Sequence, residues 1–175
     1  FNITENDVRR VKNKYSIVAD YVLYVGTLKP SKNIEGLVAA FDKLTSKNSL
    51  QLVIAGKKGW MYTSMFNLVK KLGIEKRVVF TDYVTDDDKM ALRKGAKVFV
   101  QPSFWEGFGI DTLSCMALGV PVVASNVGSL AEVIGNAGVV IDPYNIDDIA
   151  RGLSKVLNMS QKEYNKQITL GIDQA

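Results

Sequence analysis

The stretch VFVQPSFWEGFGI, residues 98–110, decides the fold, because it leads from a buried strand through a glycine-rich loop into a helix. Its first three residues are apolar, and Pro102 with Ser103 then makes a turn. Gly107 and Gly109 follow and open the helix. In open parallel sheets, loops that leave the carboxyl ends of strands carry the ligands. The stretch therefore predicts both a parallel α/β sheet and the edge where a ligand binds.

The same alternation runs along most of the chain. Short runs rich in Val, Ile and Tyr alternate with segments of helical spacing, which is typical of buried parallel strands and their crossover helices. Six strands are predicted: Tyr21–Val25, Leu50–Ala55, Val78–Phe80, Lys97–Val100, Val120–Ala124 and Gly138–Ile141. We expect an α/β fold, a doubly wound Rossmann-like parallel sheet with helices on both faces.

Capping and helix-ending residues mark where these helices begin and end, and the change in composition marks the limits of the domain. Gly73 ends one predicted helix, and Asp86 with Asp87 is predicted to cap another, which runs through Arg93 to Gly95. We expect residues 1–20 to be a linker with a short helix and 21–157 to be the ligand-binding domain. Residues 158–175 are expected to be a truncated helical tail. Both polar ends are expected to lack a partner in the core.

Composition narrows the function. The 175 residues are 47% hydrophobic and 23% charged, as in an ordinary globular domain. The chain has no His, which excludes Ser-His-Asp and Cys-His catalysis and the usual zinc sites within it. The lone Cys115 excludes an intrachain disulfide, fits a reducing compartment and is expected in the core. A net charge of +4 suits anions such as phosphates, or else reflects a solvated basic surface.

Two predicted loops pair glycine with lysine at the same sheet edge. Gly26 precedes Lys29 and Lys32, and Gly56 precedes Lys57. Neither loop matches the P-loop or dinucleotide-binding pattern. Each could be an ordinary polar loop before a helix, but two on adjacent crossovers point to an anion near the middle of the edge.

The loop at 101–110 adds a carboxylate, Glu106, between aromatic residues. Free amides at the helix start after Gly109 suit a phosphate, and Glu106 could accept hydrogen bonds from hydroxyl groups. A ligand that needs both is a nucleotide sugar. The alternative is that Glu106 caps the helix or faces solvent. The acidic run 86–88 is explained by helix capping, so we expect no metal site there.

Several stretches together resemble one family, the retaining group 1 glycosyltransferases of the GT-B fold. Within that group the chain is similar to glycosyltransferase family 4. The resemblance covers residues 21–157. The matching runs are YVGTL at 24–28, LVIAG at 52–56, VFTDYV at 79–84, VQPSFWEGFG at 100–109, MALGVPVVAS at 116–125 and LAEVIGNAG at 130–138.

The resemblance implies that this chain is the C-terminal, donor-binding half of a two-domain enzyme, which is inactive alone. Its partners would be a GDP- or UDP-linked sugar, for example an activated mannose, and an N-terminal acceptor-binding domain, but not a nucleic acid. No cofactor or metal would be needed. We expect a cytoplasmic protein, able to work at the cytoplasmic face of a membrane through the missing half.

The resemblance also assigns roles to residues. Glu106 would be the catalytic residue and, with Gly107, Phe108 and Gly109, would hold the sugar. The diphosphate would be bound by Gly26, Thr27, Lys32, Gly109 and Ile110. The base and ribose would be bordered by Gly56, Lys57, Tyr83, Val84 and Ser114.

Two departures from the family pattern leave alternatives open. The second Glu of the family, which binds ribose, is replaced by Ser114, and Asp111 either compensates for it or serves only the helix dipole. An Arg common in relatives is replaced by Thr27 or Ser31, so Lys29 or Lys57 could share the diphosphate. The chain could then be an inactive nucleotide-sugar-binding module. A nucleotide-sugar epimerase fits the run 106–109 poorly.

Overall fold

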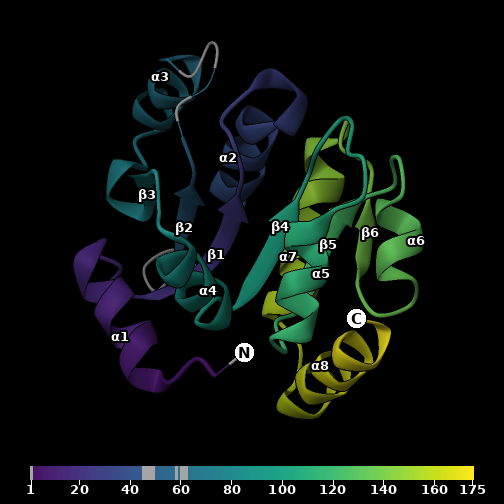
Figure 1. Ribbon diagram of the computed structural model, residues 1–175. Helices are drawn as coiled ribbons and strands as arrows, with labels where there is room; N and C mark the ends of the chain where they lie inside the picture. The colour runs from purple at the N-terminus through teal and green to yellow at the C-terminus, as the bar shows by residue number, and fades with distance from the viewer. Residues whose placement is uncertain (1, 45–49, 58, 60–62) are drawn as a thin grey trace.

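The computed structural model describes residues 2–44, 50–57, 59 and 63–175. A six-stranded parallel sheet runs through its centre in the order β3-β2-β1-β4-β5-β6 (Figure 1). The strands are β1 Asp20–Val25, β2 Leu50–Ala55, β3 Val78–Asp82, β4 Val98–Gln101, β5 Val122–Ser125 and β6 Val139–Ile141. This strand order is that of the doubly wound dinucleotide-binding fold, so the predicted fold class is confirmed.

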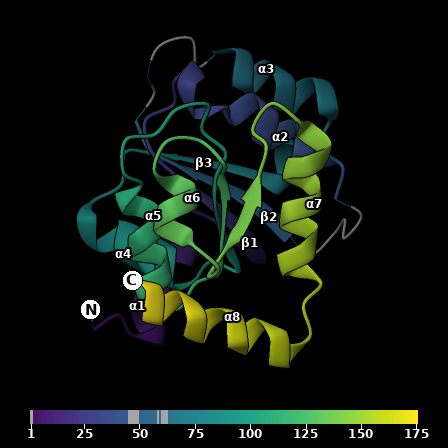
Figure 2. The same ribbon diagram turned by 90° about the vertical axis from the view of Figure 1, so that its right-hand side faces the viewer.

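Helices cover both faces of the sheet (Figure 2). The α-helices are α1 Glu5–Lys14, α2 Ile34–Asp42, α3 Thr63–Leu72, α4 Asp86–Lys94, α5 Ile110–Ala117, α6 Leu130–Ile134, α7 Ile146–Leu157 and α8 Gln161–Gln174. Two short 3-10 helices, η1 Pro30–Lys32 and η2 Glu75–Arg77, precede α2 and β3. Alternate strand residues divide the core, since Val22 and Tyr24 pack with α2 and α7 while Leu23 and Val25 pack with α4 and α5.

Strand boundaries shift by one or two residues from those predicted. β3 continues to Asp82, where its pairing with β2 is irregular beside Ala55. β5 begins at Val122 and not at Val120, since Pro121 has no N–H group to give to a ladder. The carbonyl of Pro121 still accepts a hydrogen bond from Phe99 N at 3.0 Å. Gly73 follows α3 with a φ of +68°, as predicted for a residue that ends a helix.

The expectation that both chain ends lack a core partner is wrong. On α1, Val11 is fully buried, and Ile17 beyond the helix is buried as well. Figure 1 shows α8 below α5 and α6, and the Tyr164 hydroxyl on α8 donates to the carbonyl of Lys97 at 2.8 Å. Each terminal helix buries few residues, so hydrophobic periodicity signals them weakly.

The cap predicted for α4 is also wrong in detail. Thr85 is the N-cap, and its hydroxyl accepts a hydrogen bond from Asp88 N at 3.3 Å. Asp88 turns inward and accepts from Arg10, Lys14 and Tyr15, which ties α1 to α4. Cys115 is buried, as expected. Within the described ranges, no helix is both long and apolar enough to cross a membrane.

Candidate functional site

A pocket of about 230 Å³ lies where β1, β2 and β3 end, and we call it the sheet-edge pocket. Six predicted site residues line it, so the structure brings together the first three loops as expected. Its lining residues are Val25, Gly26, Thr27, Ala55, Gly56, Lys57, Tyr83, Val84, Lys89 and Asp111. Sequence reasoning missed Lys89, which comes from α4 and not from a strand end.

The backbone makes the floor of this pocket. Gly56 has a φ of +150°, and a Cβ there would lie 2.0 Å from the carbonyl oxygen of Gly26. The two loops therefore touch through their main chains, which only glycine permits. Gly26 and Gly56, which directly follow β1 and β2, have no side chains, so a ligand can approach the backbone closely there.

A cation and an aromatic ring form one wall. The Lys57 ammonium group lies 4.8 Å from the centre of the Tyr83 ring. Such cation–π contacts hold a lysine side chain in place while leaving its charge available to an anion. Tyr83 is exposed, and the neighbouring Val84 is buried. The wall thus offers a ring face and a positive charge at the mouth of the pocket.

A second group of predicted residues meets beside the pocket. The Lys32 ammonium group lies 2.6 Å from Glu106 Oε2, and the two side chains are only 14% and 17% exposed. Gln101 Nε2 and Ser103 Oγ lie 2.8 Å and 3.4 Å from the same oxygen. Among the described residues, Glu106 Oε1 has no bonded partner. The alternative in which Glu106 caps α5 or faces solvent is therefore wrong.

The direct contact between Lys32 and Glu106 was not predicted. The sequence predicted that the lysine binds a phosphate and that the carboxylate binds a sugar, without a contact between the two. A usable signal existed, because the two opposite charges follow the adjacent parallel strands β1 and β4.

Hydrogen bonds between loops fix this pair. Phe104 N donates to the carbonyl of Ser31 at 2.9 Å, which joins the loop after β4 to the loop after β1. The Asn33 side chain donates to the carbonyl of Pro143 at 2.7 Å. Ser129 Oγ donates to the carbonyl of Gly107 at 2.5 Å. The site is thus held by contacts among four loops.

Helix α5 begins at the same place with unsatisfied amides. Gly109 is its N-cap with a φ of +83°, and no side chain caps it. The first bond into the helix runs from Leu113 N to the carbonyl of Gly109 at 3.1 Å, so the preceding amides have no intrahelical acceptor. These amides and the helix dipole favour an anion. Ile110 is exposed, like Trp105 and Phe108 in the loop before it.

Of the five residues predicted to border the base and ribose, Ser114 is the one that does not line the pocket. Its hydroxyl donates to the carbonyl of Ile110 at 2.8 Å, one turn back along α5. Asp111, on the same helix, lines the pocket and pairs with Arg93 of α4. The carboxylate in the pocket therefore comes from the first turn of α5 and not from the second.

Three of the buried polar atoms that lack a hydrogen-bond partner belong to β1, to β4 and to the first turn of α5. Tyr24 OH, Gln101 Oε1 and Thr112 Oγ1 have no hydrogen-bond partner in the described part of the chain. Burial, followed by the charges of Glu106 and Asp111, raises the pKa of Tyr24 well above its usual range, so it stays a neutral hydroxyl. Buried groups of this kind normally find partners, so these three atoms are unusual in the core beneath the site.

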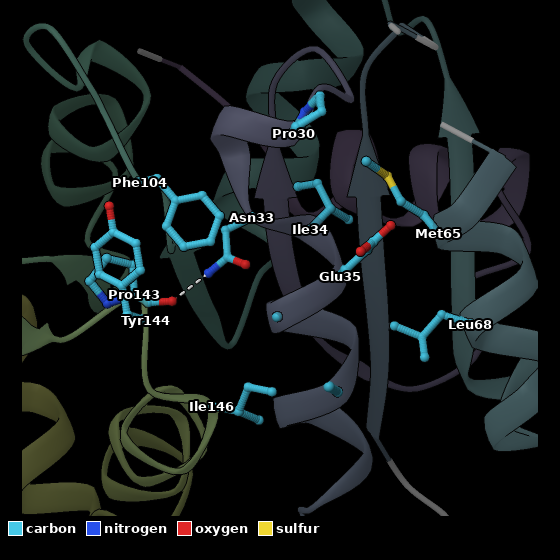
Figure 3. Close-up of a pocket in the computed structure, with 12 residues that line it drawn as sticks. Pro30, Asn33, Ile34, Glu35, Met65, Leu68, Phe104, Pro143, Tyr144 and Ile146 are labelled. Atoms are coloured by element: carbon cyan, nitrogen blue, oxygen red, sulfur yellow. Dashed lines mark hydrogen bonds between the residues drawn. The ribbon is translucent and has the colours of Figure 1, made fainter. Parts of the chain in front are cut away.

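A second hollow, of about 530 Å³, opens on the outer side of α2 (Figure 3). None of the predicted site residues lines it. Phe104 and Tyr144 stack there with ring centres 4.8 Å apart, next to the bond from Asn33 to Pro143. Three of its lining residues, Asn33, Phe104 and Pro143, take part in the hydrogen bonds that join the loops around the site. Among the described residues, no cluster of three His, Cys, Asp or Glu side chains could hold a metal ion.

The sequence model for group 1 glycosyl transferases matches residues 8–171. The chain belongs to the group 1 glycosyltransferase family. It is 42% identical over 143 residues to the O-antigen chain mannosyltransferase B of Escherichia coli. That match covers 80% of this chain and 38% of the relative, so the chain spans less than two fifths of that protein.

Two solved structures show the same fold. The C-terminal domain of a group 1 glycosyltransferase from Francisella tularensis has a TM-score of 0.83 at 21% identity, covering 99% of this chain and 93% of that one. An Anabaena protein solved with UDP and glucose, HepE, has a TM-score of 0.87 at 19% identity, covering 97% and 47%. The chain is thus a group 1 glycosyltransferase domain with the architecture of one half of a GT-B enzyme.

Proposed function

We propose that this chain binds a nucleotide-diphosphate sugar at the carboxyl edge of its sheet, as the donor half of a retaining glycosyltransferase. The observation that carries the proposal is the contact between Lys32 and Glu106, which come from the loops that follow the neighbouring strands β1 and β4. A cation for phosphate and a carboxylate for hydroxyl groups lie together, beside a pocket large enough for part of a nucleoside.

Each part of the donor has a counterpart in the site. Lys32, the loop Gly26–Thr27 and the amides of Gly109 and Ile110 suit the diphosphate. The wall of Lys57 and Tyr83, with Gly56 and Val84, suits the base. Glu106 and the loop Gly107–Gly109 suit the sugar. The HepE complex supports this division, because that protein of the same fold was solved with UDP and glucose.

This placement supports a retaining transfer reaction. The bond between the sugar C1 and the diphosphate oxygen breaks, and its electron pair stays on that oxygen. Lys32 and the α5 amides stabilise this negative charge, so the site needs no metal. Glu106 orients the sugar while the acceptor oxygen bonds to C1 on the face that the diphosphate leaves. The acceptor hydroxyl gives its proton to a base outside this chain.

The relatives favour a hexose, and a mannose in particular, since the Escherichia coli relative is a mannosyltransferase. The base is guanine or uracil. A thermal-shift screen of this chain against UDP, GDP, ADP and their sugars tests the proposal. A bound nucleotide stabilises the fold by mass action, so one base should raise the Tm above the others. If no nucleotide raises it, the proposed donor site is wrong.

A second candidate is a binding module of the same fold that has lost catalysis. The observation that favours it is Ser114, whose hydroxyl is engaged with the helix backbone and not with the pocket. Both candidates predict nucleotide binding. Glycosyl transfer by the full-length protein would eliminate the module, and binding without transfer would eliminate the enzyme.

A further inference from the structure

The sheet-edge pocket holds one carboxylate among the described residues that line it, that of Asp111. The other charged groups there are the ammonium groups of Lys57 and Lys89. Asp111 belongs to the first turn of α5, and its side chain is 36% exposed. A carboxylate would repel a diphosphate, so its presence in a pocket for anions needs a reason of its own.

Arg93 fixes this carboxylate. The arginine lies on α4, is only 7% exposed, and one of its Nη atoms contacts Asp111 Oδ1. The other contacts the sulfur of Met90 at 3.2 Å, which holds the guanidinium group in place. No described residue is bonded to Asp111 Oδ2. A buried cation therefore neutralises the carboxylate while leaving one of its oxygens available as an acceptor.

A fixed carboxylate with an open oxygen suits a ligand group that donates hydrogen bonds. Gly26 and Tyr83 line the same pocket as Asp111, and the proposed function gives Gly26 to the diphosphate and Tyr83 to the base. The part of a nucleotide that connects these two groups is the ribose, whose neighbouring hydroxyls donate hydrogen bonds. Ser114 is not available for this role, since it donates to Ile110 and does not line the pocket.

We infer that Asp111 accepts hydrogen bonds from the ribose hydroxyls and makes the site selective for ribonucleotides over 2′-deoxyribonucleotides. The inference rests on the proposed function. The competing explanation is that Asp111 only complements the positive end of the α5 dipole, a role that needs no ligand.

Calorimetry of this chain with UDP and GDP, each paired with its 2′-deoxy counterpart, separates the two explanations. For the base that binds, we expect the unmodified chain to prefer the ribonucleotide by about tenfold, the value of one charge-assisted hydrogen bond. In Asp111→Asn the preference should fall to within about twofold. Removing the charge also changes the repulsion of the diphosphate, but this change is common to both ligands and cancels in their ratio.

Glu132→Gln is the matched control, because it removes an exposed first-turn carboxylate from α6, outside the pocket. It should keep the full preference. Ser114→Ala should keep it too, and a loss there would move ribose recognition to Ser114 and overturn the inference. Asp111→Ser provides a second variant, with the same expectation, should the Asn variant fold poorly.

The outcomes distinguish this inference from the proposed function. An unchanged preference in both Asp111 variants, with diphosphate binding intact, overturns the role of Asp111 and leaves the donor site standing. Equal affinity of the unmodified chain for ribo- and deoxyribonucleotides does the same. Failure of every nucleotide to bind the unmodified chain overturns both.

Discussion

Lys32 and Glu106 lie 74 positions apart in the sequence and meet only because β1 and β4 are neighbours in the sheet. Neither side chain is well solvated, so each depends on the other to satisfy its charge. In the proposed donor complex, phosphate oxygens join the lysine and sugar hydroxyls join the carboxylate. The pair thus keeps both groups ordered before the ligand arrives.

Replacement of Lys32 by Ala should weaken the binding of a nucleoside diphosphate far more than that of the nucleoside. The lost contact is charge-assisted and is commonly worth ~1.5–3 kcal/mol. Calorimetry with both ligands measures the difference. Lys70→Ala, at an exposed lysine of α3 outside the site, is the control and should change neither affinity appreciably. Equal weakening of both ligands by Lys32→Ala would place this lysine away from the phosphates.

Replacement of Glu106 by Gln should leave nucleoside diphosphate affinity undiminished, because Lys32 is then released to the phosphates. Affinity for the intact nucleotide sugar should fall, as should turnover of the full-length enzyme, since the sugar hydroxyls lose an ionised acceptor. Titrations with the diphosphate and with the nucleotide sugar, alongside turnover, measure these effects. Glu132→Gln serves as the control, and full turnover of the Glu106 variant would end the assignment.

Residue by residue, the sequence indicates which loops form the site but not how their side chains pair. Glycines and lysines after predicted strands locate the sheet-edge pocket, because parallel strands end at one edge. The contact of Lys32 with Glu106 depends on strand order, and the position of the Asp111 side chain depends on its pairing with Arg93. The hydrophobic periodicity of the sequence predicts neither of these contacts.

Among the elements, α1 is attached to the domain by charge as well as by apolar contact. Asp88 of α4 is buried and accepts hydrogen bonds from Arg10 at 2.6 Å and from Tyr15 at 2.8 Å, as well as from Lys14. Burial alone would raise the pKa of Asp88, but the bonds from Lys14, Arg10 and Tyr15 outweigh it and hold the pKa well below its usual range. The folded state therefore favours the ionised form of the Asp88 carboxyl group.

Replacement of Asp88 by Asn should lower the stability of the fold at neutral pH by roughly 1–3 kcal/mol, because three donors lose an ionised acceptor. A carboxylate with a lowered pKa stabilises the fold above its unfolded pKa of about 3.9, and this contribution is lost as pH falls through the folded pKa. The gap in Tm between the unmodified chain and the variant should therefore narrow between about pH 4 and about pH 2.

The control for this effect is Asp147→Asn, at an exposed carboxylate on α7. It should leave the Tm nearly unchanged at every pH. A gap between the Asp88 variant and the unmodified chain that stays constant with pH would show that shape, and not charge, holds α1 in place.

Strands were easier to predict than the terminal helices for a physical reason. A strand buried on both faces is a continuous apolar run, visible in the sequence. Helices α1 and α8 each bury one residue against the domain, and their other contacting residues are only partly buried. Their attachment relies on Asp88 and on the bond from Tyr164 to Lys97, which are long-range polar contacts without a local pattern.

At the scale of the whole molecule, the candidate site occupies one edge of the six-stranded sheet. Tyr83, Trp105, Phe108 and Ile110 are all exposed at that edge. Large apolar side chains that gather beside a ligand site are typical of surfaces that another body covers. In the proposed enzyme that body is the acceptor domain, and the chain spans only 38% of its Escherichia coli relative.

We therefore expect this chain alone to bind a nucleotide sugar without transferring it. Binding needs Lys32, Glu106 and the sheet-edge pocket, all of which the chain contains. Transfer also needs an acceptor held within reach of C1, and positioning of this kind can contribute many orders of magnitude in rate. Incubation of the purified chain and of the full-length protein with labelled donor and acceptor measures the difference. The Glu106→Gln variant of the chain controls for contaminating enzyme. Transfer by the unmodified chain that this variant abolishes would prove that the donor domain is catalytically sufficient, and the division of labour proposed for the two halves would then be wrong.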